Sequence, residues 1–166
     1  MADAFLKLLY DDGRPLPGDS QDLFHLGWIS LDSVTIDSAQ SWPHGAPAND
    51  TAPRGPDPRQ AATMVKAMDV ASQALATACV TGVQFSSATI EIVRGGPAAE
   101  RLICRFEAVV IAAFQPNGRG TGSVAREQVT INYGKVGYAR GPSGITRIVD
   151  STASAAAAVL RAAFGR

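Results

Sequence analysis

Apolar and polar residues alternate along much of this chain, a pattern typical of half-buried β-strands. The clearest example is Arg126–Tyr138, in which apolar residues occupy every second position up to Tyr133. After Gly134 the apolar face continues one position out of phase, beginning at Val136. A shift of one residue beside a glycine predicts a β-bulge, and bulged strands curve a sheet towards a closed barrel.

Five further segments are predicted to be strands. They are Ala4–Tyr10, Trp28–Asp37, Ala61–Lys66, Phe85–Val93 and Arg101–Phe114. A change of phase at Asp32–Ser33 predicts a second bulge. In the Phe85–Val93 strand, Glu91 falls on the outward face. From Ala108 onwards the polar positions disappear, which predicts a strand covered on both faces.

One helix is predicted between these strands, with Asp69 as its N-cap, an end near Val80 and Gly82 as its stop signal. Ser72 faces away from the apolar stripe. The stripe consists of Ala71, Leu75, Ala78 and Cys79.

The remaining segments are a long loop and a tail. The loop, residues 38–60, holds five of the ten prolines and has almost no periodicity. The tail is rich in alanine, and residues 150–164 are predicted to be helical. The fold class is therefore mainly β: a small antiparallel barrel with one flanking helix, a long extended loop and an Ala-rich helical tail.

The composition of the chain argues against several classes of function. Lysine plus arginine and aspartate plus glutamate number 15 each, so no net field attracts nucleic acid or an acidic membrane. The N-terminus lacks the basic and apolar regions of a Sec signal peptide.

Two cysteines, Cys79 and Cys104, are predicted to be buried free thiols. Two histidines and two cysteines at unrelated spacing predict no metal site and no cofactor.

Two catalytic interpretations are weighed against simpler ones. The glycine-rich run Gly118–Ser123 has no following helix and no placed lysine, so a connecting loop is favoured over a phosphate site. His25 lies near Ser20 and Asp22 in the sequence, but no nucleophile elbow is present. His25 is therefore predicted to anchor its loop by hydrogen bonds, and the chain is not predicted to be an enzyme.

Several motifs resemble the Hcp family (haemolysin-coregulated protein), the tube proteins of bacterial type VI secretion. The similarity spans about residues 3–138, in matching order. The motifs are Gly18-Asp19-Ser20-x-Asp22-x-x-His25-x-Gly27-x-Ile29, Asp69–Gly82, Thr89-Ile90-x-Ile92-x-Arg94-x-Gly96 and Arg126-Glu127-x-Val129-Thr130-x-Asn132-Tyr133-x-Lys135-Val136. The resemblance implies an Hcp-like barrel domain at residues 1–140 and a C-terminal extension at residues 141–166, for which no matching motif is identified.

The resemblance implies a structural subunit. Six copies would form a ring, and rings would stack into a tube that is assembled in the cytoplasm, expelled by the type VI system and able to carry effectors in its lumen. Implied partners are the sheath, spike and baseplate proteins, with neither nucleic acid nor a membrane. An Hcp-like effector or adaptor, and a monomeric ligand-binding barrel, remain alternatives.

Candidate residues fall into three groups. The expected contacts between rings are Trp42, His44, Arg54, Asp57 and Arg59. The expected lumen-facing residues are Ser33, Thr35 and Asp37. The residues expected to maintain the structural motifs are Asp22, His25, Glu127, Asn132 and Lys135.

Overall fold

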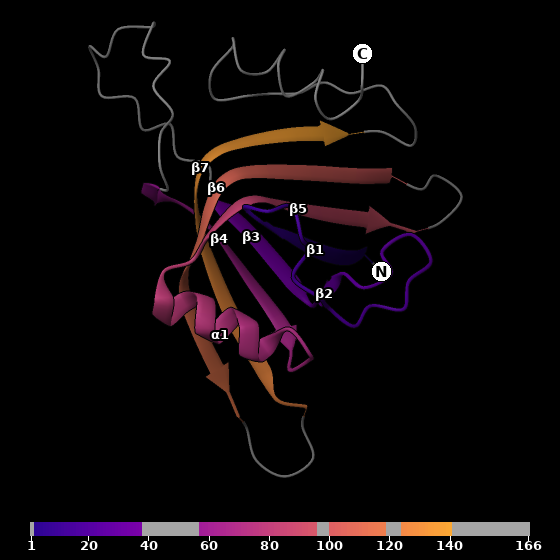
Figure 1. Ribbon diagram of the computed structural model, residues 1–166. Helices are drawn as coiled ribbons and strands as arrows, with labels where there is room; N and C mark the ends of the chain where they lie inside the picture. The colour runs from indigo at the N-terminus through magenta and orange to yellow at the C-terminus, as the bar shows by residue number, and fades with distance from the viewer. Residues whose placement is uncertain (1, 38–56, 96–99, 119–123, 141–166) are drawn as a thin grey trace, which may run out of the picture.

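The computed structural model describes residues 2–37, 57–95, 100–118 and 124–140 (Figure 1). These residues form one antiparallel sheet of seven strands and one helix. The elements are β1 (Ala2–Tyr10), β2 (Ile29–Leu31), β3 (Ser33–Asp37), β4 (Asp57–Ala67), α1 (Ser72–Thr81), β5 (Gln84–Arg94), β6 (Glu100–Asn117) and β7 (Arg126–Arg140). The predicted helix at 150–164 and most of the 38–60 loop lie outside the described residues. The loop was predicted to extend too far, because β4 begins at Asp57.

The sheet curls so that its two edges meet. Its strand order is β2-β1-β5-β6-β7-β4-β3, and the two outermost strands, β2 and β3, are joined through the single residue Asp32. The backbone N–H of Asp32 donates to the carbonyl of Val65 in β4, over 2.7 Å. The side chain of Asp32 pairs with Arg126 at the start of β7. The predicted bulge at Asp32–Ser33 is wrong: the strand breaks there and changes its pairing partner, which brings the edges of the sheet together.

A sharp bend runs through β5, β6 and β7 (Figure 1). Ser86, Ala108 and Gly134 occupy one row across these strands, because Phe85 pairs with Val109 and the flanking pairs keep the same register. Each strand exchanges its buried and outward positions at this row. In β6 the buried residues are Cys104 and Phe106 before the bend and Val109 and Ile111 after it. Ala108 has a φ of 54° and is the non-glycine residue with positive φ in the described part of the chain.

This bend replaces the bulge predicted beside Gly134. The register of β6 with β7 is continuous from Glu107↔Lys135 to Val109↔Tyr133, so β7 has no extra residue there. The register shift lies farther along, between Ile111 and Ala113 of β6. The phase change was thus predicted correctly, and its proposed cause was wrong.

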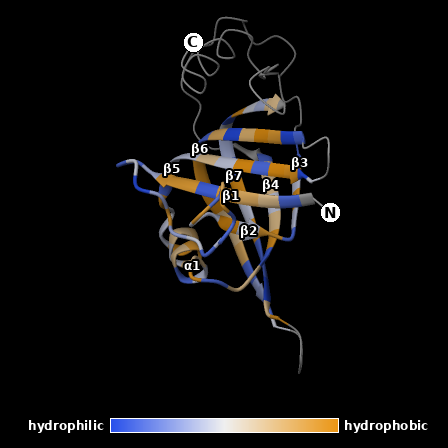
Figure 2. Ribbon diagram, turned by 90° about the vertical axis from the view of Figure 1, so that its right-hand side faces the viewer, coloured by the Kyte–Doolittle hydropathy of each residue, from blue (hydrophilic) through white to orange (hydrophobic). Residues whose placement is uncertain are grey.

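The barrel interior is filled with side chains from all sides. Its largest fully buried residues include Phe85, Phe106, Met64, Leu8 and Tyr133. Hydrophobic and polar positions alternate along the strands in Figure 2, as half-buried strands require. Beyond Ala108, however, β6 is not covered on both faces as expected, because Ala112 is exposed.

Helix α1 lies across the lower part of the barrel in Figure 1 and contacts β6. Ala71, Leu75 and Ala78 of the predicted stripe are buried. Gly82 ends the helix with a left-handed φ of 69°, and its N–H donates to the carbonyl of Ala78. The N-cap residue is Ala71 and not, as predicted, Asp69. The carboxylate of Asp69 nevertheless accepts a hydrogen bond from the N–H of Ala71, over 2.9 Å. No helix in the described ranges is long and apolar enough to cross a membrane.

Candidate assembly surfaces

The loop between β1 and β2 is held to the barrel by a buried histidine. His25 is 2% exposed, and its ring stacks on Phe5 with ring centres 4.1 Å apart. Its Nδ1 lies 2.6 Å from the carboxylate of Asp22, and its Nε2 lies 2.7 Å from that of Glu91 in β5. The hydrogen bond with His25 is the main reason why the pKa of Asp22 lies below its ordinary value of 3.8. The loop is therefore fixed both by ring stacking and by hydrogen bonds.

Backbone contacts make the same loop rigid. Gly18 and Gly27 are hydrogen-bonded to each other, and the N–H of Gly27 donates to the carbonyl of Ser20. A Cβ atom on Gly18 would lie only 2.3 Å from the carbonyl oxygen of Trp28, so only glycine fits there without movement. The glycine at this position of the motif therefore allows the two arms of the loop to approach closely.

This rigid loop exposes three large apolar side chains. Leu23 is 92% exposed, Phe24 is 74% exposed and Leu26 is 69% exposed. The guanidinium of Arg101 lies over the ring of Phe24, with 5.3 Å between its central carbon and the ring centre. We call Leu23, Phe24 and Leu26 the loop patch. Neighbouring exposed apolar residues on a fixed backbone are a common feature of protein contact surfaces.

A second buried polar cluster joins α1 to the barrel. Lys66 of β4 is fully buried, and its Nζ donates to Asp69 over 2.7 Å and to Glu127 over 2.9 Å. Glu127 also accepts from the hydroxyl of Ser72, over 2.8 Å. Ser72 therefore faces this cluster, and its predicted outward orientation is wrong. The cluster links the end of β4, the start of β7 and the first turn of α1.

A second exposed apolar group surrounds this cluster. Met68, Val70 and Val124 are each more than half exposed. The N–H of Met68 donates to the carbonyl of Ala125, which joins the two chain segments that carry the group. We call Met68, Val70 and Val124 the helix-end patch. The loop patch is anchored to β1 and β5, whereas the helix-end patch lies where β4 ends and β7 begins.

The structure brings three of the five motif residues into the two clusters: Asp22 and His25 into one, and Glu127 into the other. Asn132 lies half-buried in β7, between Ala61 and Val110 of the neighbouring strands. Lys135 lies 3.9 Å from the carboxylate of Glu107 on the outer face.

The other candidates lie elsewhere. Ser33, Thr35 and Asp37 are exposed along β3, while the residues between them pack against the core. Trp42, His44 and Arg54 lie outside the described residues. Asp57 and Arg59 belong to β4 and not to the loop.

Sequence reasoning missed two buried charges, Lys66 and Glu91. The pattern contained a signal for Lys66, because it continues the inward positions of Ala62 and Met64. Glu127 likewise continues the inward positions of β7, and the two residues are direct partners across the strands. Opposite charges at facing inward positions indicate a buried ion pair. The alternation predicts that Glu91 lies on the outward face of its strand. The side chain is only 8% exposed, however, because the loop that carries His25 covers it.

His25 is not arranged as a catalytic base. Both of its ring nitrogens are bonded to carboxylates, and the hydroxyl of Ser20 contacts the backbone N–H of Asp22. A nucleophile needs a base within hydrogen-bonding reach. In this arrangement the ring of His25 instead connects a loop to a strand.

The fold is thus a curled antiparallel β-barrel with one flanking helix, and it carries exposed apolar patches on its surface. This chain belongs to the Hcp family of type VI secretion: it matches the family described as "Type VI secretion system effector, Hcp" over residues 5–139. The family consists of secreted proteins of this system, including its structural tube proteins. No curated protein matches the chain.

Solved Hcp structures share the fold. Hcp1 from Salmonella typhimurium is 22% identical, with a TM-score of 0.69, and the match covers 89% of this chain and 91% of that one. Hcp3 from Pseudomonas aeruginosa is 14% identical, with a TM-score of 0.65 and coverage of 90% and 98%. A type VI secretion system effector from Yersinia pestis is 19% identical, with a TM-score of 0.64 and coverage of 89% and 99%.

Proposed function

We propose that this chain is the tube subunit of a type VI secretion system. Six copies form a ring, rings stack head to tail, and the tube is expelled with effectors in its lumen. The observation that carries this proposal is membership of the Hcp family over residues 5–139. The sheath, spike and baseplate proteins of the system are the implied partners.

The two apolar patches support assembly into a ring. The loop patch lies in the loop between β1 and β2, and the helix-end patch lies where β4 ends and β7 begins, so one copy can present its loop patch to a different surface of the next copy. Contacts between unlike surfaces produce rings when the rotation closes. Burial of exposed leucine, phenylalanine and methionine side chains against each other removes their apolar surface from water, which stabilises a contact between copies.

The packed interior disfavours the alternative of a ligand-binding barrel. The centre of this barrel is occupied by fully buried side chains, among them Phe106 and Tyr133, whose ring centres lie 4.7 Å apart. A ligand barrel needs an internal cavity of several hundred cubic ångströms. An Hcp-like effector or adaptor is expected to differ from a tube subunit in its state of assembly, and electron microscopy can distinguish the two.

Electron microscopy of the purified chain tests the proposal. The tube subunit is expected to form rings with a central opening, and a field of single barrels would contradict the proposal. The double variant Leu23→Ser/Leu26→Ser tests the loop patch and should lose rings while keeping its strands. Val80→Ser is the matched control, because Val80 is 87% exposed but belongs to neither patch. Rings that persist in the double variant would place the ring contact on another surface.

Stacking is proposed to depend on the loop before β4. Deletion of residues 42–56 leaves β4 intact, whereas a deletion that continued to Pro58 would remove its first residues. The shortened chain should form rings that no longer stack. Failure to form rings at all would assign the loop to contacts within a ring.

The lumen is proposed to be lined by the exposed positions of β3. Ser33→Gln and Thr35→Gln enlarge two of these side chains without adding charge. Loss of cargo protection in assembled rings is the expected result. Protection that survives both changes would place the lumen on a different face.

A further inference from the structure

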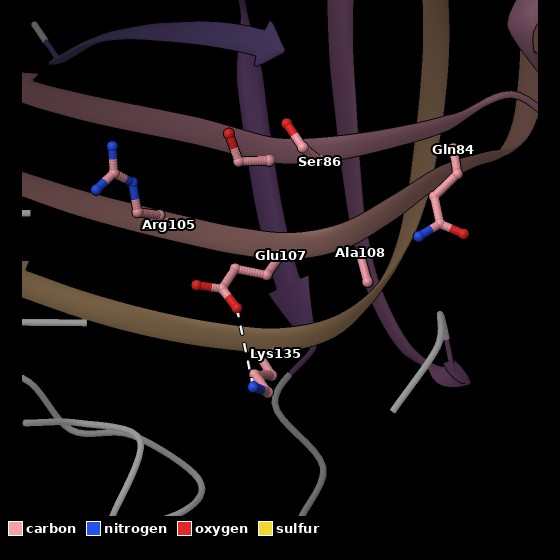
Figure 3. A pocket seen from close by; sticks show the side chains of 7 residues that line it. Gln84, Ser86, Arg105, Glu107, Ala108 and Lys135 are labelled. Atoms are coloured by element: carbon pink, nitrogen blue, oxygen red, sulfur yellow. Dashed lines mark ion pairs between the residues drawn. The ribbon is translucent and has the colours of Figure 1, made fainter. Parts of the chain in front are cut away.

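The bend in β5, β6 and β7 creates a pocket on the outside of the barrel. Its volume is about 380 Å³, within the range of small-ligand sites. Figure 3 shows its side chains projecting from three neighbouring strands. Ala108, at the bend, contributes only a methyl group. The polar residues that line it include Gln84, Ser87, Arg105, Glu107 and Lys135.

The pocket contains an arginine that has no partner among the residues that the structure describes. Arg105 makes no hydrogen bond or ion pair with any residue in the described ranges. The residues that face it directly across the strands are Thr89 and Gly137, so neither facing position carries a carboxylate. The five N–H groups of a guanidinium match the two oxygens of a carboxylate.

The charges of the lining favour a ligand with one negative charge. Glu107 and Lys135 face each other across the strands at 3.9 Å, and each side chain is nearly half exposed. Their charges cancel, which leaves the single positive charge of Arg105. A carboxylate matches this single charge, whereas a doubly charged phosphate would keep one negative charge without a counter-charge in the pocket.

Neutral polar groups complete the pocket. Ser87 lies opposite Glu107, and Gln84 lies on the far side of the bend. Neither side chain is hydrogen-bonded to another described residue. The hydroxyl of Ser87 can bind a polar atom adjacent to a carboxylate, such as one of a peptide bond.

We propose that this pocket binds a carboxylate group, with Arg105 as the residue that contacts it. The carboxylate can belong to a small free acid or to an acidic residue of a polypeptide. The proposal concerns the outer face of the barrel and does not depend on ring assembly.

Calorimetric titration of the full chain tests the pocket with three probes: acetate, inorganic phosphate, and a blocked peptide that contains one glutamate. Acetate and the peptide should both bind to the wild type. Arg105→Gln should weaken binding about tenfold or more, as expected when a charged hydrogen-bond donor is lost. Arg94→Gln is the matched control, because Arg94 is an exposed β5 arginine outside the pocket, and it should leave binding unchanged.

The relative affinities identify the source of the carboxylate. Equal affinity for acetate and the peptide indicates a small free acid, whereas clearly tighter binding of the peptide indicates a polypeptide. Replacing the glutamate of the peptide with glutamine should abolish its binding. The proposal is overturned if neither carboxylate probe binds, if phosphate binds more tightly than both, or if Arg105→Gln binds as the wild type does. Unchanged thermal melting of Arg105→Gln shows that a loss of binding does not come from unfolding.

Discussion

Replacing Lys66 with methionine tests the buried cluster that joins α1 to the barrel. The ammonium of Lys66 is fully buried and donates to Asp69 and Glu127, while Ser72 bonds to the same Glu127. Methionine keeps most of the volume of the side chain, so packing changes little. The main effect is electrostatic, because two buried carboxylates lose the cation between them.

The expected loss is large. Removing one partner of a buried ion pair costs about 3–5 kcal/mol, because the remaining charge stays buried without compensation. Here the side chains of Asp69 and Glu127 are only 6% and 3% exposed, so water cannot replace the ammonium. The free energy of unfolding of Lys66→Met should therefore fall by an amount in this range. The double variant Lys66→Met/Glu127→Gln should lose less, since one of the two buried charges is also removed.

Urea unfolding measures these changes, and the chain concentration is kept fixed because the stability of a self-associating protein depends on concentration. Lys135→Met is the matched control: its ion pair with Glu107 is 3.9 Å long, and both side chains are nearly half exposed. Such a pair contributes at most about 1 kcal/mol. The reasoning is refuted if Lys66→Met loses no more stability than Lys135→Met.

Four further predictions follow from single residues. Gly18→Ala should destabilise the protein by about 1–3 kcal/mol in the same assay, because its Cβ would meet the carbonyl of Trp28. Ala108→Gly should stabilise it by up to about 1 kcal/mol, since the φ of 54° disfavours alanine; a loss would show that the methyl group is needed. Burial raises the pKa of the Cys104 thiol to about 12, so a thiol reagent should label it only after unfolding. His25 lowers the pKa of Asp22 below 3.8, so the stability that Asp22 adds is present above that pH and lost as the pH falls through the lowered pKa; unfolding of Asp22→Asn should therefore approach that of the wild type in acid, and a constant difference would contradict this.

The local pattern was sufficient to predict most of the elements. Period-two alternation located the strands, and Gly82 marked the end of the helix because a left-handed residue is needed there. Both cysteines are free, as their apolar neighbourhoods predicted, but only Cys104 is buried, because Cys79 is partly exposed. These features depend on residues close in sequence, which one chain shows directly.

Features that depend on several strands were harder to predict. The phase change at Gly134 is visible in β7, but its cause is a bend shared with Ser86 and Ala108 on two other strands. An alternating pattern cannot distinguish a bulge from such a bend until the register is known. The strand break at Asp32 likewise depends on the closure of the sheet, which no local signal shows.

The buried charges illustrate the same limit. Lys66 lies in phase with the core positions of β4, so its burial could have been inferred together with that of Glu127. Burial of Glu91 depends instead on a loop that is more than sixty residues away in sequence and brings His25 over it. Only the folded chain shows that contact.

The native mass of the purified chain, measured by light scattering on a size-exclusion column, tests the tube proposal most directly. The account predicts a mass near six times the 17.3 kDa of one chain. A single species at the mass of one chain would contradict assembly and favour a barrel that acts alone.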